Sequence, residues 1–446
     1  MSTQSQQALR HRRIMADLER RVNNVMRYSR SHPDASISEL EEKARQVSEG
    51  CFASVLEALI EERRQEAEET PRCTCGRLMS YKGDQVRHQE TYVGRITWRR
   101  GYYYCPVCRK GRYPLDDALE IASGQFSDAV QAGVSWVAAK EPFEPAAKTF
   151  TYLTRISIAD REVERVSEGR GAVLEAHQAL ERRKLLSGQG TTVSRPRDRP
   201  GVWAVALDAA RGRFEDGWHD IHAGAVFWAH PKVGEDEICG AKAEEQSYVV
   251  QVRDLQKAGE KLYAEAVRRG IDPGQDLVVC LADGAVGNWN QFALHFPKRV
   301  EVLDWWHAVD HLWAAGKGAF GEGTAQTTAW VEARKAELWE GRVDAVLAAL
   351  QAAASKPGGK AAADEVHYFE TNRERMRYSE FRAKGYPIGS GTVESACKRV
   401  ITYRVRQSGM RWTEPGAQAV LTLRAELLSG RWDEAWQATR LRAKAA

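Results

Sequence analysis

The chain has 446 residues, of which 43% are hydrophobic and 28% charged, and its formal net charge is +4 at pH 7. This composition is typical of an ordinary globular protein, and the length predicts three or four domains. No apolar run approaches the roughly 20 residues that span a bilayer, and the first residues, MSTQSQQALRHRR, lack the apolar core of a signal peptide. Integral membrane proteins are therefore excluded, and we expect a cytoplasmic protein without a membrane partner.

The N-terminal region, residues 1–70, is expected to be helical. Residues 8–30 and 37–69 are predicted helices, the second because its apolar residues recur roughly along one stripe. Pro71 ends the second helix. We interpret this second helix as a packing element.

Two cysteine pairs in residues 71–114 flank a segment rich in β-branched and aromatic residues, with a turn near Gly94. Thiolates on two tight knuckles joined by a hairpin predict a closed tetrahedral site for structural Zn²⁺, in a small zinc-ribbon β module. The alternative is four thiols without a metal. The predicted ligands are Cys73, Cys75, Cys105 and Cys108.

Residues 115–185 read as short helices joined by tight breaks, which could form a helix-turn-helix with its recognition helix starting at Ser157. A generic helical subdomain is the alternative. Residues 186–200 are rich in Gly, Ser, Thr, Pro and Arg, which is typical of a linker. We therefore place a domain boundary there.

Three short apolar strands in residues 201–307 are each followed by an aspartate, which is typical of buried strands whose carboxyl ends open on a site. In open α/β sheets, ligands bind beyond those ends. Alternatively, Asp283 and Gly284 form a turn, and Asp304 caps a helix. The strands and their acids are Val202–Leu207 with Asp208, Leu277–Leu281 with Asp283, and Val300–Leu303 with Asp304.

Residues 308–385 are alanine-rich and wholly helical in pattern, so we expect an all-helical insertion into the α/β domain. The domain then resumes in residues 386–446 with C-terminal helices. There, Thr392 or Ser390 can cap a helix whose first turn holds Glu394. The helix dipole favours a carboxylate at that position.

Basic residues are unevenly spread along the chain. Residues 1–30 carry seven arginines against two acids, and two further stretches, Thr91–Leu115 and Ser395–Thr413, contain no acid. Such stretches predict a polyanion partner, although each alone could be a solvated surface. The candidate nucleic-acid contacts are Arg95, Arg99 and Arg100 in the ribbon and Lys398, Arg399, Arg404, Arg406 and Arg411 near the C-terminus.

The segments LADGAVGNWN, VEVLDWWHAVDHL and GSGTVESACKRVITYRVRQSGMRW, followed by an LTLR helix, resemble the DDE transposases of bacterial insertion sequences. The resemblance is closest to the Kra branch, which is related to the Mutator-like transposases, and it spans about Val202 to Trp432. It implies an α/β RNase H-like catalytic domain, with a mixed sheet and flanking helices, around the helical insertion.

The resemblance implies an acidic triad of Asp208, Asp283 and Glu394. Asp208 is followed by two alanines where the family leads us to expect a glycine, so Asp216 is a rival for the first carboxylate. Three carboxylates suit a pair of Mg²⁺ or Mn²⁺ ions, which prefer oxygen ligands and can drive in-line phosphodiester cleavage. We expect Asp208 to bridge the two ions.

Asp304 and His307 match the D-x-x-H motif of the family and are expected beside the metal site. His307 would position DNA or support the acidic strand ends. A satisfied structural histidine is the alternative.

The predicted function is that of an insertion-sequence transposase, which binds terminal inverted repeats, cleaves the ends and joins them to target DNA. The partners would be double-stranded DNA and further copies of the chain, in a homodimer or larger assembly in the bacterial nucleoid. The alternatives are a catalytically inactive zinc-containing DNA-binding regulator and an RNase H-like nuclease or resolvase without strand transfer.

Overall fold

The computed structural model describes residues 3–66, 70–189, 198–234, 238–356, 359–389, 391 and 396–443. The chain divides into two compact units. The first consists of Met1–Ala138, Pro142–Val166 and Arg440–Ala446, and the second of Ala139–Glu141 and Ser167–Thr439. None of the helices within the described ranges combines the length and apolarity that a bilayer crossing requires.

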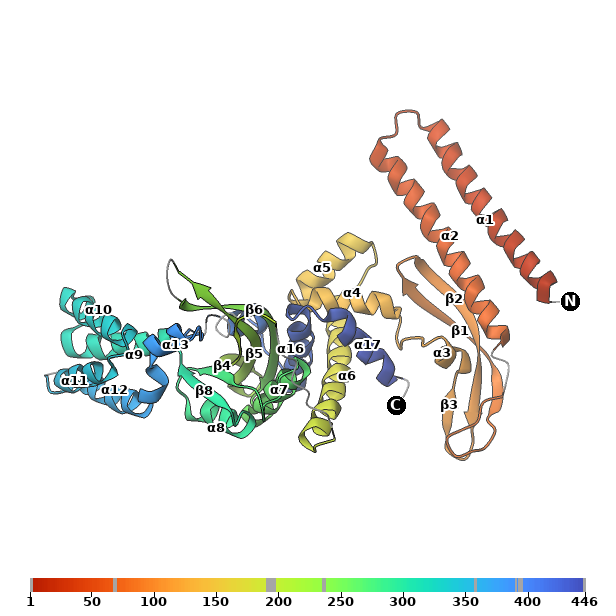
Figure 1. The fold of residues 1–446 in the computed structure, drawn as a ribbon. Coiled ribbons are helices and arrows are strands. Elements are labelled where there is room, and N and C mark those ends of the chain that lie inside the picture. The colour runs from red at the N-terminus through yellow and green to blue at the C-terminus, as the bar shows by residue number, and fades with distance from the viewer. Residues whose placement is uncertain are drawn as a thin grey trace. The chain divides into compact units, whose positions relative to one another are not determined.

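The first unit begins with two long helices, α1 (Thr3–Ser31) and α2 (Ile37–Glu66), which lie side by side and antiparallel (Figure 1). A capping box starts α2. The backbone N–H of Ser36 donates to Glu39 Oε2 (2.8 Å), and the backbone N–H of Glu39 donates to Ser36 Oγ (3.3 Å). The predicted helical character of this region is thus present in the structure.

A three-stranded antiparallel sheet follows, in the order β1 (Ser80–Thr91), β2 (Gly94–Cys105) and β3 (Lys110–Arg112). Gly94 adopts a φ of +107° at the tight turn between β1 and β2, a conformation that favours glycine. The sheet packs on α2 and on the short helix α3 (Pro114–Ala118). The core between them consists of Ala53, Ile60, Ile96, Trp98 and Leu115.

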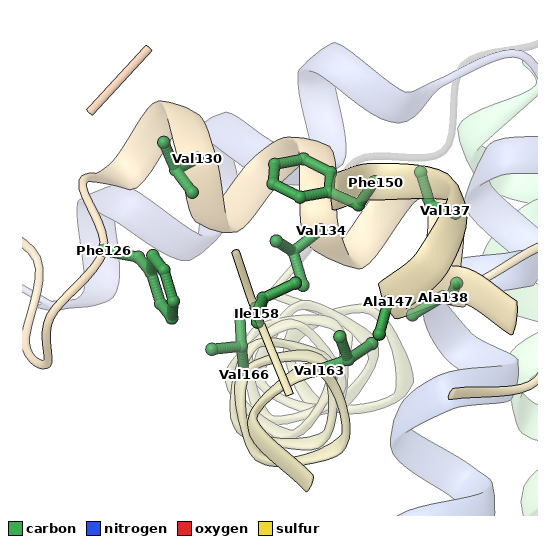
Figure 2. Packing of buried hydrophobic residues seen from close by; sticks show 11 residues of the cluster. Phe126, Val130, Val134, Val137, Ala138, Ala147, Phe150, Ile158, Val163 and Val166 are labelled. Carbon is green, nitrogen blue, oxygen red and sulfur yellow. The ribbon is translucent and has the colours of Figure 1, made fainter. Parts of the chain in front are cut away.

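The three helices α4 (Asp128–Ala138), α5 (Phe143–Thr154) and α6 (Asp160–Leu186) come next in the chain. Figure 2 shows their shared apolar core, in which Val134 of α4, Phe150 of α5 and Val163 of α6 are buried. Arg155 ends α5 in the left-handed conformation, and α6 begins at Asp160 rather than at the predicted Ser157. The two helices are therefore joined by residues 155–159.

The second unit is built on a five-stranded sheet with the strand order β6-β5-β4-β7-β8. Its strands are β4 (Val202–Phe214), β5 (Gly217–Val233), β6 (Ile238–Val252), β7 (Val278–Ala282) and β8 (Arg299–Leu303). The first three are antiparallel, whereas β7 and β8 run parallel to β4. The sheet is therefore mixed, as predicted.

The first strand of this sheet is longer than predicted, because β4 continues past Asp208 to Phe214. Every residue from Val202 to Phe214 pairs with β5. In the extension, the buried Gly212 and Phe214 alternate with exposed neighbours, as in a strand with one covered face. Asp208 thus lies within a continuous hairpin strand rather than at its end.

Helices α7 (Leu255–Arg268) and α16 (Glu414–Leu428) pack on β6, and α8 (Val286–His295) packs on β7 and β8. A buried ion pair ties α6 to α7: Lys261 Nζ lies 2.8 Å from Glu175 Oε2 and donates to the carbonyl oxygen of Val250 (2.9 Å). Thr422 and Gln418 of α16 also donate to Glu175 Oε2, at 2.8 and 3.4 Å. These contacts anchor three helices to one edge of the sheet.

A helical block follows β8 and precedes the end of the chain (Figure 1). The chain then passes through η2 (Cys397–Thr402), which is a π-helix, and α15 (Tyr403–Val405) to α16 and α17 (Trp432–Ala443). The block contains α9 (Trp305–Phe320), α10 (Ala325–Trp339), α11 (Val343–Ala354), α12 (Lys360–Thr371), the 3-10 turn η1 (Arg373–Met376) and α13 (Tyr378–Ala383).

Candidate active site and cysteine cluster

Three aspartates occupy one row across the parallel strands. Ala206 of β4 pairs with Leu281 of β7, so Asp208 and Asp283, each two residues later, are in register. Ala282 of β7 pairs with Leu303 of β8, so Asp283 and Asp304, each one residue later, are in register as well. The ladder reaches Asp304 itself, whose backbone N–H donates to Ala282 (2.9 Å). The three predicted strand-end acids therefore lie at the same edge of the sheet.

The surroundings of Asp208 disfavour the ionised form of its carboxyl group. Its Oδ1 accepts a hydrogen bond from the backbone N–H of Ala209 (2.7 Å). Burial raises the pKa of the Asp208 carboxyl, and the negative charge of Asp283 raises it further, whereas Ala209, His307 and the thiol of Cys397 lower that pKa. Net elevation of the pKa means that this site disfavours a bare negative charge and would gain from a cation.

Asp283 is held from two sides in the loop after β7. Its Oδ1 accepts from the backbone N–H of Ala285 and from Asn288 Nδ2, both at 3.0 Å. The same amide of Asn288 reaches the carbonyl oxygen of Leu207 (3.4 Å), so one α8 side chain links the middle of β4 to the loop after β7. These contacts leave Asp283 Oδ2 as the oxygen better placed to bind a ligand.

Two tyrosines from the helical block hold the backbone at the strand ends. Tyr368 donates to the carbonyl oxygen of Asp283 (2.8 Å), and the fully buried Tyr378 donates to that of Leu303 (3.0 Å). Gly284 has a φ of +102°, and a Cβ there would lie 2.7 Å from the ring of Tyr368. The close approach of Tyr368 therefore requires glycine after Asp283.

Asp304 is completely buried and caps α9. Its Oδ1 accepts from the backbone N–H of His307 (2.9 Å) and lies 3.0 Å from Nδ1 of the same residue. The hydrogen bond to Asp304 raises the pKa of His307 to about 9; burial opposes this shift, and the charges of Asp304, Asp208 and Asp283 add to it. The raised pKa favours the imidazolium form of His307 at neutral pH, with Asp304 as its hydrogen-bond partner and the charges of Asp208 and Asp283 acting in the same direction.

The rival acid Asp216 lies elsewhere, at the turn between β4 and β5. The strand from Asp208 to that turn is about 20 Å long at roughly 3.3 Å per residue. Asp216 pairs with Arg253 (2.6 Å) and His219 (3.1 Å), and the hydrogen bond from Arg253 lowers its pKa. The structure therefore does not bring Asp216 to the row of aspartates.

Glu394, with Ser390 and Thr392, lies outside the described residues. The nearest described residues after it are Ala396 and Cys397, both buried. The thiol of Cys397 hydrogen-bonds to Asp208. The chain thus returns to Asp208 three positions after Glu394.

The four predicted cysteines come together in the first unit. Their sulfur atoms all lie within 4.8 Å of one another, which fits one metal ion such as Zn²⁺. The first knuckle is closed by backbone hydrogen bonds from Cys73 to Arg77 and from Gly76 to Cys73, each 2.8 Å. A backbone hydrogen bond from Cys75 lowers the pKa of Cys73 to about 6, whereas hydrogen bonds with Cys75 and Cys73 raise the pKa of Cys108 to about 12, so the two thiols do not ionise equally. Across the part of the chain that the structure describes, this is the group of His, Cys, Asp or Glu side chains that converges to metal-binding distance.

The predicted DNA contacts differ in exposure. Lys398, Arg399, Arg406 and Arg411 are exposed, as are Arg95 and Arg99 in the ribbon. Arg404, in contrast, is fully buried, with its guanidinium 5.0 Å from the ring centroid of Trp412, and Arg100 is paired with Asp116. Arg404 is therefore inaccessible to DNA, and Arg100 is half-buried in an ion pair within the fold.

Four residues at the site were missed in the sequence: Asn288, Tyr368, Tyr378 and Cys397. Asn288 stands five positions after Asp283 on the helix that follows a strand end, and a polar residue in that first turn could have been noticed. Cys397 has apolar neighbours in the sequence, a pattern that indicates only a buried thiol. The two tyrosines come from helices whose sequences give no sign of a partner about 80 residues away.

Comparison with known proteins gives one partial match. Residues 31–192 match the model of UPF0236, an uncharacterised protein family. No curated protein matches the chain. The matched segment contains α2, the four cysteines and α4–α6, and it ends before β4, so the row of aspartates lies outside it.

Proposed function

We propose that the protein is a DNA transposase whose second unit has an RNase H-like catalytic fold and cleaves and joins DNA strands with divalent metal ions. The main support is the register of Asp208 and Asp283: Asp283 follows the carboxyl end of β7, and Asp208 lies on β4 just past its last parallel pair with β7. Ligands of open α/β sheets bind at such an edge. The resemblance of the surrounding motifs to DDE transposases supplies the reaction and the substrate.

The residues fit hard divalent cations. Asp208 and Asp283 offer carboxylate oxygens, which Mg²⁺ and Mn²⁺ prefer. Burial and the charge of Asp283 raise the pKa of Asp208, and a cation between them would relieve that repulsion. Two such ions would activate the attacking oxygen and stabilise the leaving oxygen in an in-line displacement.

In this proposal, Glu394 is the third acid. Glu394 stands three positions before Cys397 in the sequence, and the thiol of Cys397 contacts Asp208. Asp208 would bridge the two ions, and Asp283 and Glu394 would each complete one. His307 carries a positive charge beside these acids, which suits a residue that holds a phosphate oxygen of the DNA.

The exposed basic residues within and just after η2 lie close in sequence to Cys397 and would hold the DNA backbone. Lys398, Arg399 and Arg406 are exposed, and Tyr403 is 51% exposed among them. Phosphate contacts of this kind position the duplex without reading its sequence. The cysteine cluster would bind structural Zn²⁺, because four thiolates leave no open position for a substrate.

The test is a strand-transfer assay with pre-cut transposon ends, a target plasmid and Mg²⁺ or Mn²⁺. We expect joined products from the wild type and none from Asp208→Asn, Asp283→Asn or Glu394→Gln, with DNA binding retained. Asp216→Asn is the matched control and should join ends normally.

The products also separate the alternatives. Hydrolysis without joining would indicate a nuclease or resolvase, and binding without any reaction would indicate a regulator. Joining by the Asp283→Asn protein at the wild-type rate would overturn the site assignment.

A further inference from the structure

The helical hairpin of the first unit leaves a row of apolar side chains exposed. They recur at helical spacings of three, four or seven residues, as in one face of an amphipathic helix. We call the six residues the hairpin stripe. The stripe consists of Met15 (48% exposed), Val22 (43%) and Met26 (51%) on α1, and of Phe52 (56%), Val55 (37%) and Leu59 (53%) on α2.

The stripe lies off the two interfaces that the hairpin already makes. The helices face each other where Ser54 Oγ donates to Asp17 (3.4 Å) and where the guanidinium of Arg21 covers Gly50. A different face of α2 packs on β2 through Ala53 and Ile60. Apolar residues of both helices are therefore exposed among the residues of this unit that the structure describes.

The two rows overlap where Met15 and Val22 of α1 lie within one turn of Val55 and Phe52 of α2, and Met26 extends beyond this overlap. Since Asp17 lies level with Ser54 in an antiparallel pair, Met15 of α1 lies within one turn of Val55 of α2. Apolar residues at one height on adjacent helices form the layers of a helix-bundle core when a second pair of helices covers them.

The charges indicate what covers the stripe. Helix α1 carries seven arginines against two acids, whereas α2 carries eight glutamates against four basic residues. DNA on this face would meet the acidic α2, and a uniformly acidic or basic protein would be repelled by one of the two helices. A second copy of the hairpin offers both charges, with an acidic helix for each basic one.

We propose that two copies of the chain associate through the hairpin stripe in a two-fold symmetric four-helix bundle, with α1 of each copy beside α2 of the other. This arrangement buries the stripe and sets arginines against glutamates along both seams. It goes beyond the proposed DNA chemistry and does not depend on it.

The first test is the molar mass of the full chain, measured by light scattering after size-exclusion chromatography at micromolar concentrations. We expect a dimer for the wild type and a monomer for Met15→Glu/Val22→Glu, with a dimer dissociation constant at least tenfold higher. Asn23→Glu adds a charge to an exposed neighbouring position of α1 and should remain dimeric. Equal helical circular dichroism of the variants would show that the helices are retained.

The second test uses complementary charge swaps. Arg12→Glu/Arg27→Glu in one chain and Glu41→Lys/Glu62→Lys in another should each weaken the homodimer, and an equimolar mixture should form a mixed dimer. Rescue on mixing cannot arise from misfolding. A monomeric wild type, or a dimer that is insensitive to all these changes, would overturn the proposal. So would a loss of DNA affinity in Met15→Glu/Val22→Glu without a change of mass, which would assign the face to nucleic acid.

Discussion

Replacing Lys261 by methionine is expected to destabilise the second unit by about 3–5 kcal/mol, the usual cost of breaking a buried ion pair from one side. Lys261 is only 6% exposed, and its ammonium donates to Glu175 and to the backbone of Val250. Without it, the Glu175 carboxylate stays buried, with Thr422 and Gln418 as its remaining donors. The free-energy cost of keeping the Glu175 carboxylate inside the fold with only two neutral donors is far larger than the gain from burying a methionine side chain.

The paired change Glu175→Leu/Lys261→Met should cost much less, because it removes both charges together. Hydrophobic replacement of a buried ion pair is often neutral, although Thr422, Gln418 and Val250 each lose a hydrogen bond at about 1 kcal/mol apiece. The coupling energy in the double-mutant cycle is therefore expected to be about 2 kcal/mol or more. Urea denaturation followed by tryptophan fluorescence measures all four free energies. Additive single and double effects would refute the reasoning.

The same pair predicts a pH dependence. Burial lowers the pKa of Lys261 from 10.5 to about 8, despite the attraction of Glu175. Between those two values the unfolded chain binds more protons than the native protein, so this group makes stability rise with pH, by on the order of 3 kcal/mol across the window. The wild type should therefore gain stability from pH 8 to 10.5 relative to Glu175→Leu/Lys261→Met. Parallel pH profiles of the two proteins would contradict the assignment.

Three further predictions follow from single contacts. Tyr368→Phe removes the donor to the backbone of Asp283 and should lower the rate of strand transfer by roughly tenfold or more, since small displacements of reacting groups are costly. Tyr378→Phe removes the donor to Leu303 on the neighbouring strand and should mainly lower the free energy of unfolding, by about 1–3 kcal/mol. Gly171→Ala should destabilise by about 1–3 kcal/mol in thermal unfolding, because its Cβ would strike the backbone of α16, whereas Gly169→Ala on the same helix has open space and should stabilise by up to about 1 kcal/mol. Cys105→Ser should reduce the zinc content of the purified protein, measured by mass spectrometry, and unfold the β1–β3 module; full zinc content in this variant would refute the four-cysteine site.

The features that could be predicted from the sequence are those that depend on short, local patterns of residues. The two cysteine knuckles were predictable because a metal site requires sulfur atoms that lie close together. The bounds of β7 and β8 were predicted within one residue because short apolar runs indicate buried strands. The mixed sheet was expected only from the resemblance to the DDE transposases, and the structure contains one. In contrast, the extension of β4 was missed because it depends on pairing with β5, which no local pattern reveals.

At the candidate site, the register of Asp208, Asp283 and Asp304 could be expected from three strands that each end near an acid. Sequence could not reveal which acids remain available. Asp304 is used as a helix cap and as the partner of His307, an outcome that depends on burial. Nor could it reveal Tyr368 and Lys261, whose partners lie about 85 residues away along the chain. A contact between two single polar side chains far apart in the chain produces no periodic pattern in the sequence from which it could be predicted.

The π-helix η2 has a geometric consequence. A π-helix bonds residue i to i+5, so it holds one residue more than an α-helical turn would need. Deleting a single residue such as Thr402 would restore the ordinary winding and rotate the segment before it by about 100° relative to α15. Cys397 would then swing away from Asp208. The additional residue of the π-helix therefore sets which side chains of the preceding residues point toward the sheet.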